Sequence, residues 1–453
     1  MQIMAFGTVK QSIAALTLAN LMIGLVEFVF NMYLSRILGA EGLGMLHLVT
    51  PINCLFLSFM TEGLVTTSSK ISARHFAAGR YGLLHKSVKT ATLFSFCWSL
   101  FLVGLVFLTA RPIAIYFLQE PTLIYPILST CPLMILMSIS NIIKGHFLGL
   151  AKIKIPAVIN ITEKLLRFPI LYLLIRFCLN HFSFPSITLV YLCYAIGEIH
   201  SVFWLIVYYR WTNRRLLSLQ RSVNQAKETS SAAGILAPLI KGAAPICMTQ
   251  CLLELVNAFS SVVVKSRLCA IGYSSAEALA LLGKYKGMVF PLMGYPMILI
   301  GSICSIVIPK VATLSAAGKS AAADRLIFRC LYMALLIGLF TCGLFLAGAD
   351  VMGMFFYKRE DLGWMIRLAG LCAPLLDVTV ASTNLLISIG RESQSFRNCL
   401  LQQILLLILL ILFVGIPSLN IYGYILAAAV SNAVLLLMNL LALKRHKSTR
   451  YSS

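Results

Sequence analysis

Polar residues recur at helical spacing inside two long apolar stretches of the sequence. They are Asn20, Glu27 and Asn31 in the first stretch, and Gln250, Glu254 and Asn257 in the second. Within each stretch the spacing places all three side chains on one face of an α-helix. A carboxylate flanked by amides can hold a proton or a small cation, or bind a polar molecule. We therefore expect these faces to line a polar interior; the alternative is that they only hold helices together.

Charged side chains also occur in other apolar stretches. These are Glu163 and Arg167, Lys284 and Lys286, and a line formed by Arg367, Asp377 and Asn384. A charge in hydrocarbon costs at least about 2.5 kcal/mol, so each should face the protein interior or a wet cavity. Glu163 and Arg167 have the spacing of an ion pair, whose role is either binding or helix association. Lys284 and Lys286 either face the interior or extend to the outer interface, and Pro374 predicts a kink near Asp377.

The sequence offers no pattern typical of catalysis or of a metal site. Its 13 Cys include no CxxC pair, and its 7 His include no HExxH motif. A Cys in hydrocarbon is usually a small apolar residue. We therefore predict no catalytic residue, no metal site and no enzymatic activity.

The elements that position these residues follow from composition. The chain has 453 residues, of which 59% are hydrophobic and 11% charged, whereas soluble domains carry about 25% charged residues. This composition excludes a water-soluble enzyme and predicts an all-α polytopic membrane protein. Twelve stretches are long enough to cross a bilayer core of about 30 Å. They are residues 12–34, 43–66, 90–110, 122–143, 155–179, 186–209, 243–264, 280–308, 327–348, 364–389, 398–416 and 421–443.

The net charge of +22 is largely a matter of topology. With the N-terminus inside, 25 of the 37 Lys and Arg fall in cytoplasmic segments and 7 fall outside. This asymmetry predicts that both termini are cytoplasmic. The basic inner face would contact anionic membrane lipids, and nucleic acid is not an expected partner.

Short loop sequences repeat at a distance of about 240 residues. Ser69–Ala73 followed by Ala77–Arg80 resembles Pro309–Thr313 followed by Ala316–Lys319. An offset of six spans preserves orientation, so these are parallel repeats. We predict two parallel six-helix bundles around a central cavity, residues 1–228 and 229–453, with alternating access as the mechanism. Chance similarity of short basic loops is the alternative.

Three longer strings resemble a known family. They are Ser35–Gly44, Ile143–Gly149 and Leu281–Met288, the last followed by Pro291. In order and placement they are similar to the polysaccharide biosynthesis flippases of the stage V sporulation protein B type, within the multidrug/oligosaccharidyl-lipid/polysaccharide exporter superfamily. The resemblance extends over the whole chain, including the paired six-helix halves.

The resemblance implies a flippase that moves a polyprenyl-diphosphate-linked sugar, such as a peptidoglycan or polysaccharide precursor, to the outer leaflet of a bacterial cytoplasmic membrane. By position in family-like motifs, Arg36, Lys144, Arg267, Lys284 and Lys286 are candidates for binding the diphosphate, and Arg167 and Arg367 join them as charged residues within spans. It also implies coupling to H⁺, Na⁺ or the membrane potential, with Glu27, Glu254 and Asp377 as candidates. No other cofactor is expected, and we predict a monomer.

Twelve spans depart from the fourteen of many relatives, which weighs against lipid II as the cargo. Two other functions stay open beside the flippase: an ion-coupled drug or cation antiporter of the same superfamily, and a non-transporting membrane protein of sporulation or the cell envelope. A membrane-embedded glycosyltransferase is disfavoured because the longest outer stretch, 349–363, holds only three acids.

Overall fold

The computed structural model describes residues 2–181, 186–222, 232–316 and 320–451, and every element in these ranges is helical. The predicted all-α class is therefore confirmed. The elements are α1 (Gln2–Leu57), η1 (Ser58–Glu62), α2 (Gly63–Ala77), α3 (Tyr81–Pro112), η2 (Ile113–Phe117), η3 (Pro121–Leu123), α4 (Ile124–Leu128), α5 (Cys131–Gly149), α6 (Lys154–His181), α7 (Ser186–Ser222), α8 (Ala232–Ala270), α9 (Ser275–Gly283), η4 (Lys284–Val289), α10 (Phe290–Ala316), α11 (Ser320–Met352), η5 (Gly353–Tyr357), α12 (Gly363–Ser388), α13 (Glu392–Phe413) and α14 (Tyr422–Tyr451).

The predicted spans can be located on these helices. Within the described ranges, ten helical stretches are long and apolar enough to cross a membrane, and the first, Leu18–Ala77, covers two predicted spans. Helix α6 is not among the ten; it corresponds to the span predicted at 155–179 and carries Glu163, Lys164 and Arg167. The predicted set of twelve therefore has a helical counterpart throughout.

A glycine separates the first two spans. Gly39 interrupts α1 with φ 67° and ψ −173°, a backbone conformation that residues with a side chain rarely adopt. No atom lies within 4 Å of the place where a Cβ would stand. Backbone geometry, rather than crowding, is therefore the reason for glycine between residues 12–34 and 43–66.

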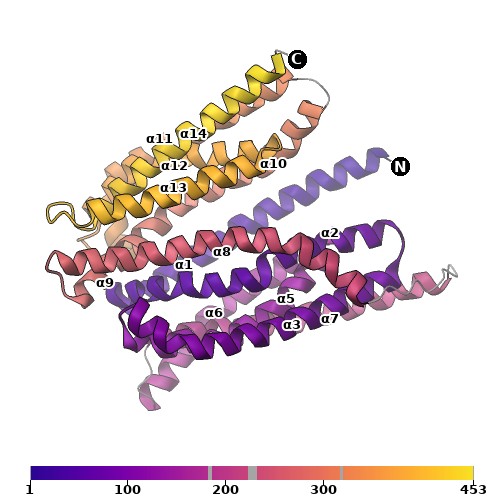
Figure 1. Cartoon of the computed structure of the whole chain (residues 1–453), viewed down its shortest axis with the longest axis horizontal. Helices are drawn as coiled ribbons and strands as arrows, with labels where there is room; N and C mark the ends of the chain where they lie inside the picture. Colours follow the sequence, from indigo (N-terminus) through magenta and orange to yellow (C-terminus); the bar gives the residue numbers. More distant parts are fainter. Residues whose placement is uncertain (1, 182–185, 223–231, 317–319, 452–453) are drawn as a thin grey trace. The chain divides into compact units, whose positions relative to one another are not determined.

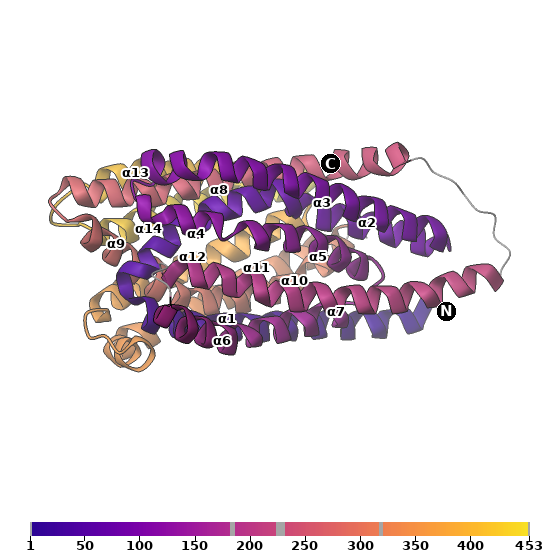
Figure 2. The same ribbon diagram turned by 90° about the horizontal axis from the view of Figure 1, so that it is seen from below.

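The first compact unit consists of residues 1–26 and 49–255. Within it, α5 packs against α2, α3 and α7, and α6 lies along α7 (Figure 2). One buried cluster joins Leu64, Val88, Ile142 and Leu239 from four helices. Apolar packing of this kind fixes the positions of the polar groups that α5, α6 and α7 carry.

The second compact unit consists of residues 27–48 and 256–453. Here α12 contacts α10, α11 and α14, and α13 runs beside α14 (Figure 1). Its core joins Ile300 and Cys304 of α10, Ala334 of α11 and Leu385 of α12. Each unit thus contains a stretch from the other half of the sequence. The boundary predicted at 228/229 lies outside the described residues, and the division into two six-helix halves stays a prediction.

Several helices contain π-helical turns, in which each turn holds an extra residue. In the described residues these turns are η1, η2, η4 and η5. The turn η4 joins α9 to α10, a helix that contains Pro296 and Pro309. Helix α12, by contrast, runs unbroken through Pro374.

Candidate functional site

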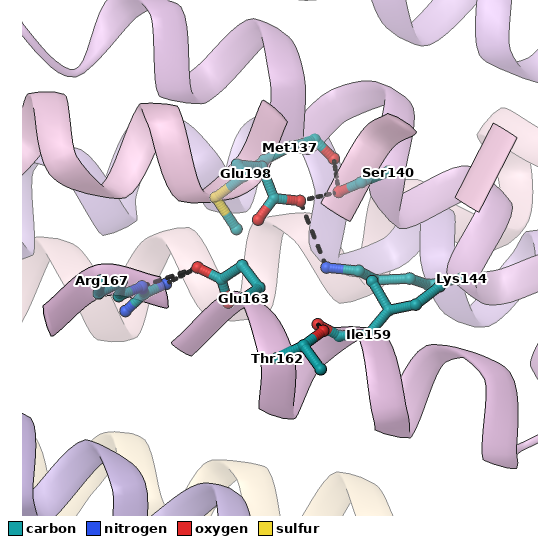
Figure 3. A network of polar contacts seen from close by, with 8 residues as sticks. All are labelled: Met137, Ser140, Lys144, Ile159, Thr162, Glu163, Arg167 and Glu198. Carbon is teal, nitrogen blue, oxygen red and sulfur yellow. Dashed lines mark hydrogen bonds and ion pairs between the residues drawn. The ribbon is translucent and has the colours of Figure 1, made fainter. Parts of the chain in front are cut away.

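A buried ion pair joins α5 to α7 in the first unit. The ammonium of Lys144 lies 3.4 Å from Oε1 of Glu198, which is 4% exposed. The hydroxyl of Ser140, one turn earlier on α5, donates a hydrogen bond to the same carboxylate oxygen (Figure 3). The carboxylate is therefore held by one charged and one neutral donor.

A second ion pair lies on α6 beside the first (Figure 3). The guanidinium of Arg167 donates to Oε1 of Glu163 at 2.7 Å, so the pair expected from their spacing is present. The guanidinium also lies 4.5 Å from the centre of the Tyr194 ring. A Cβ on Gly197 would stand 3.1 Å from Glu163 Oε1, so glycine lets α7 approach the pair closely.

Both basic residues nominated in this unit are thus compensated by a carboxylate. A buried pair of this kind is costly to break because removal of one partner leaves the other charge buried. The network links α5, α6 and α7 and is electrically neutral as a whole. Its geometry indicates a structural element at least as strongly as a binding site for an anion.

The second unit holds a cation with only neutral partners. Lys286 of η4 donates to the hydroxyl of Ser261 on α8 at 2.8 Å, and its ammonium lies 5.7 Å from the centre of the Tyr424 ring. The side-chain amide of Asn31 on α1 donates to the carbonyl of Gly287, the residue that follows Lys286, at 3.2 Å. Two groups predicted from separate stretches therefore meet at η4.

Arg36 and Arg267, in the same unit, also have no carboxylate partner among the described residues. The exposed side chain of Arg36 donates to the carbonyl of Phe356 at 3.3 Å. The Nε of Arg267 is buried without a hydrogen-bond partner. A Cβ on Gly415 would stand only 2.2 Å from Arg267 Nη2, so the loop after α13 lies directly against the guanidinium.

The remaining nominated bases in this unit are paired. Lys284 lies 2.7 Å from Oδ2 of Asp361, whose other oxygen accepts from Arg359 at 2.9 Å. Arg367 forms an ion pair with Asp350. In the loop between η5 and α12, the hydrogen bond from Arg359, with Lys284 adding to it, holds the pKa of Asp361 well below its usual range. The same bond raises the pKa of Arg359.

The polar residues predicted on helix faces have diverse surroundings. Asn20 and Glu27 are exposed on α1, whereas Gln250, Glu254 and Asn257 are half-buried on α8. The amide of Asn384 donates to the carbonyl of Val380 in its own helix at 3.0 Å. Among these amides in the described ranges, Asn31 is the one that donates a hydrogen bond to another helical segment, at Gly287 of η4.

Asp377 of α12 stands apart from the paired carboxylates. It is 1% exposed, and its Oδ2 has no hydrogen-bond partner. Burial of an ionised carboxylate without a partner is expensive. This side chain is therefore suited to bind a proton or a small cation.

Sequence reasoning gave little weight to two residues that the structure brings into these sites. Glu198 has no regular polar face around it, and its partner Lys144 is 54 residues away. His47 was not singled out, yet its Nε2 is buried without a partner beside Gly287. No spacing rule links such residues; a Gly preceding Glu198 was the sole local sign of close helix packing.

Among the described residues no group of three or more His, Cys, Asp or Glu side chains could hold a metal ion.

Comparison with known proteins gives a consistent picture of sequence relatives. The profile of the family described as "Polysaccharide biosynthesis protein" matches residues 9–315. Stage V sporulation protein B of Bacillus subtilis is 21% identical over 321 residues, which cover 68% of this chain and 59% of that protein. Sporulation protein YkvU of the same organism is 22% identical over 308 residues, covering 67% and 65%. The matches thus span about six-tenths of the length of these relatives.

Solved transporter structures share the fold. An inward-facing multidrug resistance MATE family transporter of the MOP superfamily matches with a TM-score of 0.73 at 13% identity, covering 96% of this chain and 99% of that one. A MOP superfamily transporter from Pyrococcus furiosus, described as having a binding pocket of reverse polarity, matches with a TM-score of 0.64 at 14% identity, covering 98% and 97%. At this identity the likeness concerns the fold.

Proposed function

The chain belongs to the polysaccharide biosynthesis protein family, and on that premise we propose that it is a flippase for a polyprenyl-diphosphate-linked sugar. The cargo would be a precursor of peptidoglycan or another envelope polysaccharide. It would move from the inner to the outer leaflet by alternating access. Many apolar helices and transporter-like architecture support a multi-pass membrane protein.

Three of the seven nominated bases have no carboxylate partner among the described residues, and they carry the proposal: Arg36, Arg267 and Lys286. All three belong to the second unit. Lys286 lies within a predicted span, where a charged group normally has a counter-ion, and Arg36 and Arg267 lie just beyond the ends of two others, so these cations are suited to an anionic cargo. Arg and Lys bind phosphate oxygens through strong charge-assisted hydrogen bonds. A diphosphate would supply the missing negative charge, while its prenyl chain stays in hydrocarbon.

Charge and the relatives support a proposed location. The basic excess in the segments expected to be cytoplasmic supports an orientation with both termini inside. The two Bacillus relatives carry names that refer to sporulation. These observations support our proposal that the protein lies in a bacterial cytoplasmic membrane and serves envelope or spore-wall synthesis; that it is a monomer stays a prediction.

Coupling to an ion is assigned to Asp377. Glu163 and Glu198 are each held by a cation, whereas Asp377 is buried without a partner. Uptake and release of H⁺ or Na⁺ there would change the charge of α12 during transport. Glu27 and Glu254 stay candidates from their place on the polar faces.

The test compares two lysines that lie two residues apart. Purified protein in liposomes receives a fluorescent prenyl-diphosphate sugar in the inner leaflet, and its appearance in the outer leaflet is measured. We expect Lys286→Met to reduce the rate at least tenfold, as for loss of a charged contact worth about 1.5–3 kcal/mol. The matched control, Lys284→Met, removes a lysine already neutralised by Asp361 and should retain most of the activity.

Equal effects of the two substitutions would refute the diphosphate site. The antiporter alternative is favoured by the same buried Asp377, which could hold a cationic drug. It predicts gradient-driven uptake of an organic cation and no movement of the lipid-linked sugar. A non-transporting envelope protein would move neither.

A further inference from the structure

Two cysteines face each other across neighbouring helices of the second unit. Cys304 of α10 is 0% exposed and Cys330 of α11 is 3% exposed, and their sulfur atoms lie 3.8 Å apart. Both belong to the buried cluster in which α10, α11 and α12 meet, beside Ala334 and Leu385. The three helices can be followed in Figure 1. The two thiols are therefore in van der Waals contact inside one compact unit.

The opposition of two sulfur atoms distinguishes this pair from cysteines that only fill apolar space. A filler has to be small and apolar, and it gains nothing from a second thiol opposite it. A disulfide, in contrast, requires two sulfurs. Bonded sulfurs are about 2.05 Å apart, so Cys304 and Cys330 have to approach each other by about 1.8 Å to form one. Whether they can do so depends on the mobility of the two helices.

Helix α10 has the features of a segment that can shift. It contains Pro296 and Pro309, and a proline inside a helix removes a backbone hydrogen bond. Gly294 and Gly301 lie in the same helix. Leaving aside the helix's own backbone, no described atom lies within 4 Å of the place where a Cβ on either glycine would stand. The helix is therefore loosely packed at these two positions.

Helices α11 and α12 form a tighter frame. A Cβ on Gly338 of α11 would stand 2.5 Å from the Cα of Pro374. A Cβ on Gly370 of α12 would stand 2.5 Å from the Cβ of Phe345. The two helices thus approach each other closely at two glycines. A bond from Cys330 would attach the more loosely packed α10 to this frame.

The pair lies near the membrane surface that the charge asymmetry predicts to be cytoplasmic. Both cysteines are within about one helical turn of the inner ends of their predicted spans, and their chain neighbours Ser305 and Arg329 are exposed. Disulfides in the reducing cytoplasm are transient. Hydrogen peroxide oxidises one thiol to a sulfenic acid with release of water. The second thiol then attacks that sulfur, and a second water leaves as the disulfide forms.

We propose that Cys304 and Cys330 form a peroxide-sensitive modification site whose reversible disulfide locks α10 to α11. The chemistry of the site is independent of the cargo, whereas its effect on transport rests on the flippase function. The turn η4, which carries Lys286, directly precedes α10. A locked α10 restrains that segment during alternating access and slows transport. Cytoplasmic thiols reduce the disulfide and free the helix again.

The first experiment detects the bond in the full-length protein. Purified protein in liposomes is treated with hydrogen peroxide, the remaining thiols are alkylated, and tryptic peptides are analysed by mass spectrometry with and without dithiothreitol. We expect two peptides joined through Cys304 and Cys330, which dithiothreitol separates. Cys304→Ala and Cys330→Ala should each lose this product. Cys342→Ala, the matched change elsewhere on α11, should keep it, because Cys342 is outside the pair.

The second experiment measures transport of the prenyl-diphosphate sugar by the same samples. Peroxide should reduce the wild-type rate in proportion to the fraction of joined peptide, dithiothreitol should restore it, and Cys304→Ala should be insensitive to peroxide. Absence of the joined peptides from wild type, or their persistence in Cys330→Ala, would overturn the modification site. Full transport by cross-linked protein would overturn the lock. If untreated wild type moves no cargo, the flippase function fails, while the joined peptides still establish the thiol site.

Discussion

The ion pair between Lys144 and Glu198 can be weighed quantitatively. Its atoms are 3.4 Å apart and the two side chains are 16% and 5% exposed. With an effective dielectric constant of about 20, two unit charges at that distance attract by about 5 kcal/mol, of which desolvation cancels a large part. Removal of one partner leaves the other charge buried. We expect Glu198→Gln and Lys144→Met each to lower the free energy of unfolding by about 3 kcal/mol.

The double variant separates this pair from general damage to the core. With both charges removed, no buried charge is left unpaired, so the double variant should be more stable than either single one. The coupling energy from the double-mutant cycle should exceed about 2 kcal/mol. The assay is denaturant unfolding of purified protein in micelles, followed by tryptophan fluorescence. Additive losses, or single variants as stable as wild type, would refute the reasoning from burial and distance.

Two further predictions concern the carboxylates of the second unit. Asp361→Asn should lower the free energy of unfolding by at most about 1 kcal/mol at neutral pH, because the aspartate side chain is 42% exposed and exposed ion pairs contribute little. Since the folded pKa of Asp361 is depressed, the difference in stability from wild type should hold above about pH 4 and vanish as the pH falls further. Unfolding measured at several pH values tests this, and a difference that grows in acid would contradict it. Asp377→Asn should abolish the accumulation of cargo that a proton or sodium gradient drives, while passive exchange continues. Transport into liposomes with and without a gradient measures both. Undiminished accumulation in the variant would exclude Asp377 as the coupling group.

Hydrophobic length and helical spacing predict most of the fold and one part of the site. The ion pair of Glu163 and Arg167 could be predicted because its two members lie on one helix, where a separation of four residues implies proximity. The twelve spans could be predicted because crossing a bilayer requires a long apolar segment. Both rules act within a single segment of the chain.

Pairing between distant segments could not be predicted in this way. Lys284 and Lys286 have the same residue type and nearly the same place in the sequence, yet one is neutralised by Asp361 and the other contacts only neutral groups. Which of them keeps its charge available depends on a loop more than seventy residues later. Glu198 and Lys144 present the same difficulty. The nominated set of seven bases was therefore chemically reasonable, but its division into paired and unpaired members required tertiary structure.

The π-helical turn η4 makes the environment of Lys284 and Lys286 sensitive to the insertion or deletion of a single residue. A π-helical turn holds one residue more than an α-helical turn, and one residue corresponds to about 100° of rotation about a helix axis. A one-residue deletion within 284–289 would restore regular α-helix and keep α9 and α10 in register, but it would turn side chains inside the segment relative to both helices. The lysine now beside Ser261 would then point elsewhere, without any change in composition or net charge. Among homologous sequences, the length of this segment should therefore distinguish cargo specificity better than the presence of its lysines.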